Sequence, residues 1–346
     1  MGSDRSTHHA AVLGAGSWGT ALAIHLASVG HHVVLWGRDE ALITEMTARR
    51  ANPAYLPDIT FPATMQVSAS LEEALSHVRH AIVAVPSHGL RSVVRAAAPH
   101  LPHGAVLVSA TKGFETDTLQ PMSEVIAEEC GRQHPVVVLS GPSFAAEVAR
   151  HLPTALVAAS MDVTALRLVQ EELRGPTFRL YASNDVIGVE TGAALKNIIA
   201  IAAGVVESLG LGHNALSALI TRGLVEISRL AVAMGGRRET LSGLSGLGDL
   251  VLTCTGKLSR NRHVGVELGR GRSLADVLAG MRMVAEGVKT NAAALALGAR
   301  HGVELPIASE MAEVLAGRKS PRDAVGDLML RRQRSELETY VDGSST

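Results

Sequence analysis

The residues in this chain most suited to chemistry are lysines that stand among small and apolar neighbours. Lys196 lies in the segment GAALKNIIAIAAG, residues 192–204, whose composition predicts a largely buried helix. Burial and a neighbouring positive charge both lower the pKa of a lysine, which suits a general acid–base working near neutral pH. The alternative is a lysine at the helix edge whose ammonium group reaches solvent.

Three predicted strands end in residues that could bind a ligand. These ends read VPSH at 85–88, SATKG at 109–113 and SGPSFA at 140–145. Ligands of open α/β sheets gather at the carboxyl ends of the strands, so Lys112 should project into a crevice there. Gly141 permits close backbone approach, and Ser143 offers a hydroxyl near a helix start. Taken singly, each segment could also be an ordinary turn.

A second group of polar residues lies in the last third of the chain. Asp249 follows GLG and precedes an apolar run, so it is expected in a loop or at a helix start. Ser259, Arg260 and Asn261 precede a helical stretch. A hydroxyl, a guanidinium and an amide at a helix N-terminus make a good phosphate cradle. The alternative is an ordinary helix cap with flanking charges.

Near the N-terminus the glycines of GAGSWG predict a dinucleotide site. Gly14 would allow the tight turn, Gly16 would let a pyrophosphate approach, and Gly19 would let the helix pack closely on the strand. The next strand ends in WGRD, where Arg38 could meet a 2′-phosphate and Asp39 stands one position late for binding a ribose. The sequence therefore favours NADP(H), with NAD(H) tolerated. A solvated surface role for Arg38 is the alternative.

The elements that must position these residues divide the chain into two parts. Continuous Val-, Ile- and Leu-rich runs alternate with helical stretches, which is typical of a doubly wound α/β domain with a parallel sheet. The expected strands are 10–13, 32–36, 79–85, 105–109, 135–140, 154–159 and 178–181. After residue 188 helical periodicity predicts an all-α domain, with helices at 192–209, 215–234, 259–270, 273–281, 290–301 and 306–316. The predicted domains are residues 8–188 for the dinucleotide and 189–334 for the substrate, followed by a loose tail at 335–346.

Composition excludes several classes of protein. With 346 residues, 47 % of them hydrophobic, and a net charge of −1, the chain is neither disordered nor a nucleic-acid binder that relies on bulk basicity. Two cysteines exclude a disulfide framework and favour a reducing compartment. The histidines are scattered, so no metal site is expected, and no apolar run reaches the length of a membrane span. A homodimer is the prior expectation for assembly.

Together these motifs resemble the bacterial type of NAD(P)-dependent glycerol-3-phosphate dehydrogenase. The segments that carry the resemblance are GAGSWGTALA (14–23), NPAYLP (52–57), VPSH (85–88), ATKG (110–113), SGPSFAAEV (140–148), KNIIAIAAG (196–204), GLGDLVLTC (246–254), SRNR (259–262) and VAEGV (284–288). They run in order from about residue 10 to about residue 330. The resemblance implies a cytoplasmic two-domain enzyme that reduces dihydroxyacetone phosphate to sn-glycerol 3-phosphate, the backbone precursor of phospholipids.

The resemblance also implies roles for individual residues. Besides the three glycines, the implied cofactor contacts are Ser17, Trp18, Arg38, Lys112, Ala145, Arg260, Val284 and Glu286. The implied substrate contacts are Lys112, Gly141, Ser143, Lys196, Asp249, Ser259, Arg260 and Asn261. Lys196 matches the proton acceptor, with Lys112 and Asp249 beside it as catalytic residues.

The expected reaction is hydride transfer to the ketone carbon, with Lys196 as proton donor. Lys112 would polarise the ketone oxygen and lower the pKa of Lys196, whereas Asp249 would raise it, and the sequence leaves the balance open. Two alternatives remain. One is a related dehydrogenase acting on a hydroxy acid or an acyl thioester, against which the phosphate cradle argues. The other is a dinucleotide sensor without catalysis, against which the two lysines argue.

Overall fold

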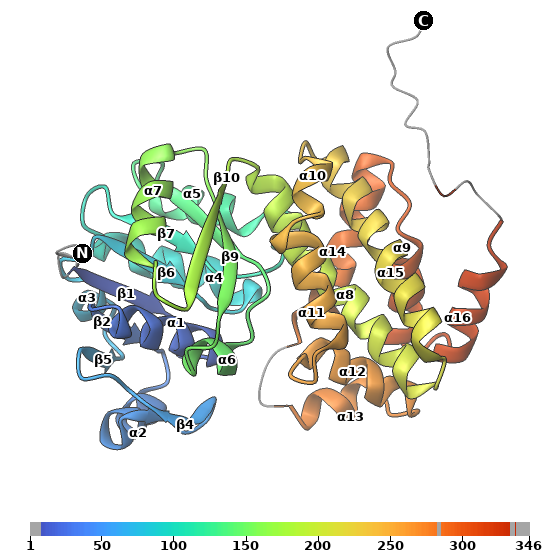
Figure 1. Ribbon diagram of the computed structural model, residues 1–346, viewed down its shortest axis with the longest axis horizontal. Coiled ribbons are helices and arrows are strands. Elements are labelled where there is room, and N and C mark those ends of the chain that lie inside the picture. The colour runs from blue at the N-terminus through green and yellow to red at the C-terminus, as the bar shows by residue number, and fades with distance from the viewer. Residues whose placement is uncertain (1–7, 282–284, 333–335, 337–346) are drawn as a thin grey trace, which may run out of the picture.

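The computed structural model describes residues 8–281, 285–332 and 336. Its α/β part and its helical part lie side by side along the longest axis (Figure 1). Of the sequence-based expectations, Val284 and all of the tail 335–346 except residue 336 lie outside the described residues. The expected division after residue 188 stays a prediction.

The α/β part is built on an eight-stranded sheet with the strand order β10-β9-β8-β7-β6-β1-β2-β5. Its strands are β1 (His9–Leu13), β2 (His32–Trp36), β5 (Met65–Ser68), β6 (His80–Val83), β7 (Val106–Ser109), β8 (Val136–Ser140), β9 (Thr154–Ala159) and β10 (Phe178–Ser183). A separate hairpin pairs β3 (Ala51–Asn52) with β4 (Leu56–Thr60). The doubly wound α/β class is confirmed, and strand β5 is an addition to the expected set.

The sheet is parallel from β5 to β8 but not throughout, which corrects the expectation of a wholly parallel sheet. β9 pairs with β8 in the antiparallel sense, and β10 pairs with β9 in the parallel sense. The connection between β8 and β9 contains one short helix, α6 (Ala145–Ala149), of five residues. Parallel neighbours are usually joined through a full crossover helix, so this short helix accompanies the antiparallel pairing.

Helices cover both faces of the sheet, which explains why the strands are apolar on both sides. On β1, Ala10 and Val12 belong to one core, and Ala11 and Leu13 belong to the other. The first core includes residues of α1 (Ser17–Ser28), α2 (Glu40–Arg49), α6 and α7 (Val163–Glu172). The second includes residues of α3 (Leu71–Leu75), α4 (Ser87–Ala97) and α5 (Met122–Cys130). A 3₁₀ turn, η1 (Ala98–His100), follows α4.

The helical part is organised around α8 (Val186–Ser208), whose residues 188–206 are all buried. It packs against α9 (Gly212–Ala233) and α12 (Arg260–Gly269). Glycines let α8 and α12 approach closely, since a Cβ at Gly204 or at Gly265 would collide with backbone of the other helix. The remaining elements are α10 (Arg238–Leu241), the π-helix η2 (Leu244–Gly248), α11 (Asp249–Thr255), α13 (Leu274–Ala279), α14 (Glu286–His301), α15 (Pro306–Leu315) and α16 (Pro321–Leu330). The helical domain is as expected, with α10, η2, α11 and α16 added.

Within the described residues, α8 is also the one helix long and apolar enough to cross a membrane. The protein itself buries 89 % of its apolar window. The apolar character of α8 is therefore accounted for by its place in the core of the helical part.

Candidate active site

Asp249 lies between the two lysines that the sequence singled out. Its Oδ1 is 2.9 Å from Nζ of Lys196, and its Oδ2 is 2.7 Å from Nζ of Lys112. The three side chains come from three elements: Lys196 from the middle of α8, Asp249 from the start of α11, and Lys112 from the segment after β7. One carboxylate therefore faces two ammonium groups at the junction of the two parts of the molecule.

Close backbone packing brings the helix of Lys196 to the element that precedes Asp249. A Cβ at Gly192, one turn before Lys196 on α8, would lie 2.9 Å from the carbonyl oxygen of Ser245 in η2. A Cβ at Gly246 would collide with the backbone of Leu241. The glycines of this region thus allow the π-helix that ends at Gly248, directly before Asp249.

Thr253 completes the cluster, and the sequence analysis did not single it out. Lys196 Nζ donates a hydrogen bond to Thr253 Oγ1 at 2.6 Å, and Thr253 Oγ1 donates to the carbonyl oxygen of Asp249 at 2.6 Å. Thr253 stands four residues after Asp249, so the two share one face of α11. That spacing was the available signal. The hydroxyl fixes the position of the Lys196 ammonium.

Burial and charge compete at these groups. Burial lowers the pKa of Lys196, Asp249 raises it and Lys112 lowers it, with a net value of about 8. Burial raises the pKa of the Asp249 carboxyl, but Lys112 and Lys196 lower it by more, so it lies below its ordinary value. The balance that the sequence left open is thus decided. Asp249 stays ionised, and Lys196 changes protonation near neutral pH.

Gly141 and Ser143 lie beside Lys112. Nζ of Lys112 donates to the carbonyl oxygen of Gly141 at 3.4 Å, and the Ser143 hydroxyl donates to the same oxygen at 3.0 Å. Gly141 has φ +134°, and a Cβ there would approach Leu156. This is a position that only glycine occupies without strain. The three residues therefore line one wall beside Asp249.

Ser259 and Asn261 both have structural partners at the start of α12. The Ser259 hydroxyl accepts the backbone N–H of Arg262 at 3.2 Å, as an ordinary N-cap does. Oδ1 of Asn261 accepts the backbone N–H of Gly287 at 3.0 Å, which ties α12 to the start of α14. Arg260, between them, keeps an exposed side chain. Although the side chain reaches solvent, the surrounding protein partly desolvates its guanidinium and lowers the pKa of this group, whereas Glu286 raises it.

The glycine turn has the three properties expected of a dinucleotide site. Gly14 has φ +122°, and a Cβ there would lie 2.6 Å from the carbonyl oxygen of Ala84. A Cβ at Gly19 would collide with the carbonyl oxygen of Gly14, whereas one at Gly16 would meet no atom within 4 Å. No side chain caps α1. The open space thus lies at the helix terminus where a pyrophosphate would approach.

The other residues expected to contact the cofactor differ in their exposure and in their hydrogen-bond partners. Nε1 of Trp18 is buried without a hydrogen-bond partner in the structure. Arg38 is exposed just after β2, and Ala145 opens α6, which packs against α1. Both carboxylate oxygens of Glu286 bind Ser87, accepting its N–H at 3.3 Å and its hydroxyl at 2.7 Å. Glu286 thus joins the helical part to the start of α4.

Two family models match the chain in the order of its two parts. The N-terminal model of NAD-dependent glycerol-3-phosphate dehydrogenase matches residues 9–166, and the C-terminal model matches residues 185–326. The chain belongs to the NAD-dependent glycerol-3-phosphate dehydrogenase family. It is therefore an NAD(P)-dependent oxidoreductase, and the resemblance found in its motifs is confirmed.

Named members of this glycerol-3-phosphate dehydrogenase family are similar to the chain over nearly its whole length. Glycerol-3-phosphate dehydrogenase [NAD(P)+] of Syntrophotalea carbinolica is 52 % identical, over 94 % of this chain and 99 % of its own length. The enzyme of the same name from Koribacter versatilis is 53 % identical, over 94 % and 98 %. The crystal structure of glycerol-3-phosphate dehydrogenase from Coxiella burnetii superposes with a TM-score of 0.91 at 41 % identity and covers 94 % of this chain and 99 % of its own.

Proposed function

We propose that Lys196, Lys112 and Asp249 carry the reaction of the family, the NAD(P)H-dependent reduction of dihydroxyacetone phosphate to sn-glycerol 3-phosphate. One observation carries the assignment of these residues. A single buried carboxylate lies within 2.9 Å of both ammonium groups, on Oδ1 and on Oδ2. A cluster of perturbed titratable groups between two domains is a strong candidate for a catalytic site.

Lys196 is the proton donor of the reduction. When bound, NAD(P)H supplies the hydride for the ketone carbon. As the hydride arrives, the ketone oxygen gains negative charge, which the Lys196 ammonium neutralises by donating a proton. In the reverse direction the neutral amine takes the proton from the C2 hydroxyl. A pKa of about 8 lets both forms of Lys196 exist near neutral pH.

Lys112 and Asp249 set the charge around that proton. Lys112 offers a second positive charge to the developing alkoxide, and its cation helps to lower the pKa of Lys196. Asp249 holds both lysines in place, and Thr253 orients the Lys196 ammonium from the other side. The negative charge of Asp249 also offsets the mutual repulsion of the two lysine ammonium groups.

The substrate phosphate would lie against Arg260, with Gly141, Ser143, Ser259 and Asn261 lining its site. The support for this placement is the exposed guanidinium of Arg260 at the start of a ten-residue helix. A guanidinium can hold two phosphate oxygens at once, and a helix N-terminus favours an anion.

The dinucleotide would bind across the turn that contains Gly14, Gly16 and Gly19. The open space at Gly16 and the unpartnered Nε1 of Trp18 fit such a ligand. Ser17, Arg38, Ala145, Arg260, Val284 and Glu286 remain proposed cofactor contacts. Arg38 is proposed to favour NADPH over NADH through its charge.

A cofactor-oxidation assay tests this function. The purified chain should oxidise NADPH, and NADH less efficiently, when dihydroxyacetone phosphate is present. The same assay with 2-oxo acids, the oxidised forms of hydroxy acids, in place of dihydroxyacetone phosphate should show no turnover. Turnover of a 2-oxo acid but not of the phosphorylated ketone would contradict the proposed substrate.

Assembly, location and metabolic role are proposals that extend beyond the site. We infer a homodimer in the cytoplasm that supplies glycerol 3-phosphate for phospholipid backbones. Support for a reducing compartment comes from Cys130 and Cys254, which are both buried and free. Light scattering on the purified chain tests the dimer, and a mass of about 36 kDa instead of twice that value would contradict it.

A further inference from the structure

Residues 112–121 form a closed loop that begins with Lys112 and leads into α5, and we call this segment the arm. An isolated antiparallel bridge between Phe114 and Pro121 closes it. The backbone N–H of Glu115 also donates to the carbonyl oxygen of Gln120 at 2.9 Å. Lys112, which contacts Asp249, thus lies at the base of this loop. The contacts within the arm define the conformation of the loop.

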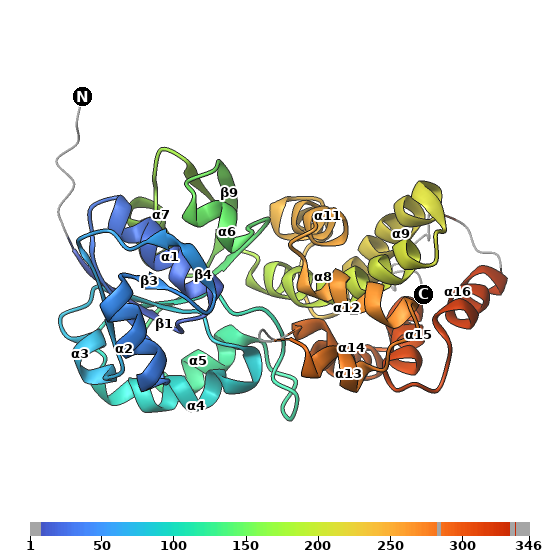
Figure 2. The same cartoon turned by 90° about the horizontal axis from the view of Figure 1, so that it is seen from below.

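One side of the arm packs against the helical part of the molecule. Phe114 is only 3 % exposed and lies in the same core cluster as residues of α8, and Leu119 packs against that cluster. In Figure 2 the chain after β7 extends from the α/β part towards α14. The arm therefore bridges the two parts, and its placement affects where Lys112 stands relative to Asp249.

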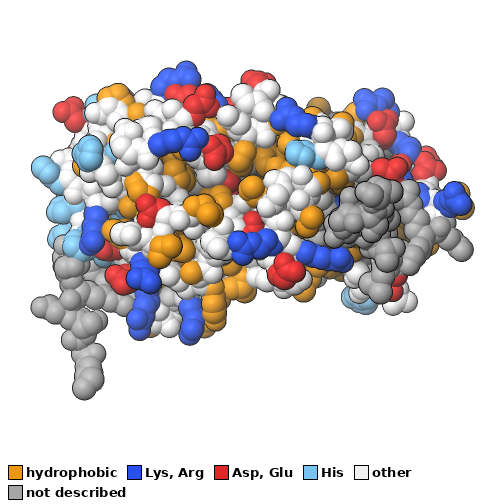
Figure 3. Space-filling model, turned by 90° about the horizontal axis from the view of Figure 1, so that it is seen from above, with side chains coloured by type: hydrophobic (Ala, Val, Ile, Leu, Met, Phe, Trp, Pro, Cys, Tyr) orange, Lys and Arg blue, Asp and Glu red, His pale blue; other side chains and the backbone are white. Residues whose placement is uncertain are grey.

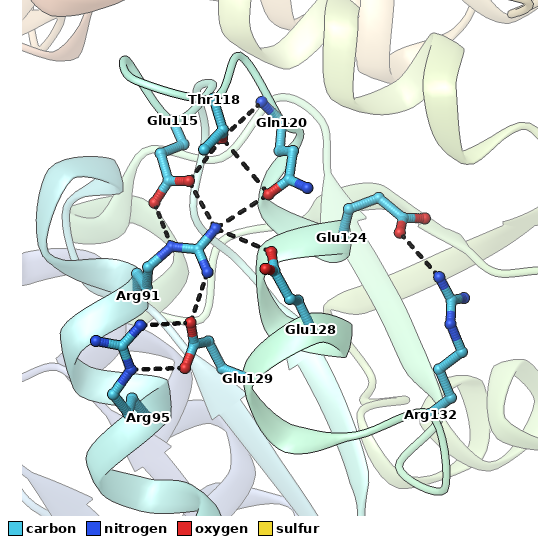
Figure 4. Close-up of polar contacts among 9 residues, drawn as sticks. All are labelled: Arg91, Arg95, Glu115, Thr118, Gln120, Glu124, Glu128, Glu129 and Arg132. Atoms are coloured by element: carbon cyan, nitrogen blue, oxygen red, sulfur yellow. Dashed lines mark hydrogen bonds and ion pairs between the residues drawn. The ribbon is translucent and has the colours of Figure 1, made fainter.

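The other side of the arm is held by Arg91 of α4 (Figure 4). Nε and Nη2 of Arg91 donate to the two carboxylate oxygens of Glu115, each at 2.7 Å. Nη2 also donates to Oε1 of Gln120 at 3.0 Å, and Nη1 donates to Glu129 of α5 at 2.5 Å. Arg91 is 22 % exposed and Glu115 is 17 % exposed, so this two-bond pair is shielded from solvent.

The arm contains a residue in a strained backbone conformation, which the contacts of Arg91 and Glu115 help to hold. Leu119 has φ +63°, a left-handed conformation that branched side chains rarely adopt. Its N–H donates to the carbonyl oxygen of Glu115 at 2.8 Å, and Thr118 Oγ1 donates to the Glu115 carboxylate at 2.6 Å. Glu115 thus connects Arg91 both to the strained residue and to the tip of the loop.

We propose that Arg91 is a positioning residue for the reaction, because through Glu115 it holds the arm in the conformation in which Lys112 reaches Asp249. This inference rests on the proposed role of Lys112 and Asp249 in catalysis. The arm has two other supports, the apolar contacts of Phe114 and, directly before the arm, the hydrogen bond from Thr111 Oγ1 to the carbonyl oxygen of Val85 at 2.8 Å. Breaking the contacts between Arg91 and Glu115 should therefore displace Lys112 without unfolding the protein.

The first test compares Arg91→Gln with Arg95→Gln. Both arginines lie on α4 and both pair with Glu129, but the hydrogen bonds described for Arg95 all go to Glu129 and none to the arm. Arg91→Gln should raise the KM for dihydroxyacetone phosphate by on the order of ten-fold and lower kcat, since small misplacements of catalytic groups are costly. Arg95→Gln should leave both constants at wild-type values.

A pH profile separates positioning from a general structural effect. The cation of Lys112 lowers the pKa of Lys196, so withdrawing it raises that pKa. The ascending limb of glycerol 3-phosphate oxidation, which needs neutral Lys196, should move to higher pH in Arg91→Gln. It should not move in Arg95→Gln. Melting temperature and cofactor affinity, measured on the same preparations, report whether each variant is folded.

The decisive measurement places Arg91→Gln in a Lys112→Met background. If Arg91 acts through Lys112, adding Arg91→Gln to Lys112→Met should cause little further loss in kcat/KM. An undiminished loss in that background would overturn the inference, as would wild-type kinetics and an unshifted pH profile in Arg91→Gln alone. Should Arg91→Gln fail to fold, Glu115→Gln replaces it, with the same expected and contrary outcomes. Failure of the proposed function would appear separately, as an inactive wild-type enzyme.

Discussion

The neighbours of Lys196 act on its charge in opposite directions. Burial and Lys112 favour the neutral amine, whereas Asp249 favours the ammonium, and the pKa is lowered from 10.5 to about 8. In the proposed mechanism, oxidation of glycerol 3-phosphate needs the neutral amine, so its rate should rise with pH through about 8. Reduction needs the ammonium, so its rate should fall above the same pH.

Lys196→Met tests this assignment directly. Methionine fits a buried helical position, so the fold should persist. Turnover should fall by on the order of 10²–10⁴-fold, because a general acid–base is lost. Steady-state rates in both directions and a binding titration with NADPH check the prediction. Unchanged cofactor affinity is the control, and near-normal turnover would refute the role of Lys196.

Arg260→Lys tests the phosphate contact. Lysine keeps the charge but loses the planar fork that can hold two oxygens at once. The KM for dihydroxyacetone phosphate should rise by roughly ten-fold or more, the equivalent of one charge-assisted hydrogen bond. Unphosphorylated dihydroxyacetone, a very poor substrate, should lose much less. Equal losses on both substrates, with weakened NADPH binding, would place Arg260 on the cofactor instead.

At the scale of elements, buried and half-buried glutamates bind the N-termini of helices that are distant in the sequence. Glu190 of α8 accepts the N–H of Ser123 in α5 at 2.9 Å, and Glu286 binds Ser87 at the start of α4. Glu226 of α9 accepts the N–H groups at the start of α15. Such contacts satisfy backbone donors that a helix cannot satisfy itself. They also join α5 and α4 of the α/β part to the helices of the site.

Glu226→Ala measures the strength of one such contact. The two carboxylate oxygens accept the N–H groups of Ile307 and Ala308 at 2.9 and 3.0 Å, and both donors would lose their partner. A buried donor left unsatisfied costs about 1–3 kcal/mol. Chemical denaturation should show a loss of that order in the free energy of unfolding. Glu313→Ala, on α15 in an exposed ion pair with Arg318, is the control and should cost much less stability.

At the scale of the whole molecule, histidines gather at the end of the α/β part remote from the helical part (Figure 3). His80, the first residue of β6, is completely buried, and neither of its ring nitrogens has a hydrogen-bond partner in the structure. Burial, together with the charges of His31, Arg79 and His8, lowers its pKa from 6.5 to about 3. The folded protein therefore holds this imidazole neutral.

His80 makes the stability of the fold sensitive to acid. The unfolded chain binds a proton at His80 below pH 6.5, whereas the folded chain does so only near pH 3, so stability falls as the pH drops through this range. His80→Phe should remove roughly 2 kcal/mol of the loss between pH about 6.5 and about 4.5. Denaturation curves at both pH values measure it.

Features that depend on contiguous residues were determined by the sequence alone. The glycines of GAGSWG define a turn through their own backbone freedom and lack of side chains, and the structure shows that turn. The apolar runs defined the strands, and the composition of residues 192–204 correctly predicted that Lys196 lies on a buried helix. A short strand such as β5, with the sequence MQVS, carries too little apolar pattern to be predicted.

Only the tertiary structure decided how remote segments meet. Lys112 and Asp249 are 137 positions apart, and the sequence could name both without showing that one carboxylate binds two lysines. The direction of the Lys196 pKa, the contact with Thr253 and the antiparallel pairing of β9 were decided in the same way. Desolvation and Coulomb energies depend on distances through space, and strand direction depends on how a connection packs. Neither quantity is encoded in the order of neighbouring residues.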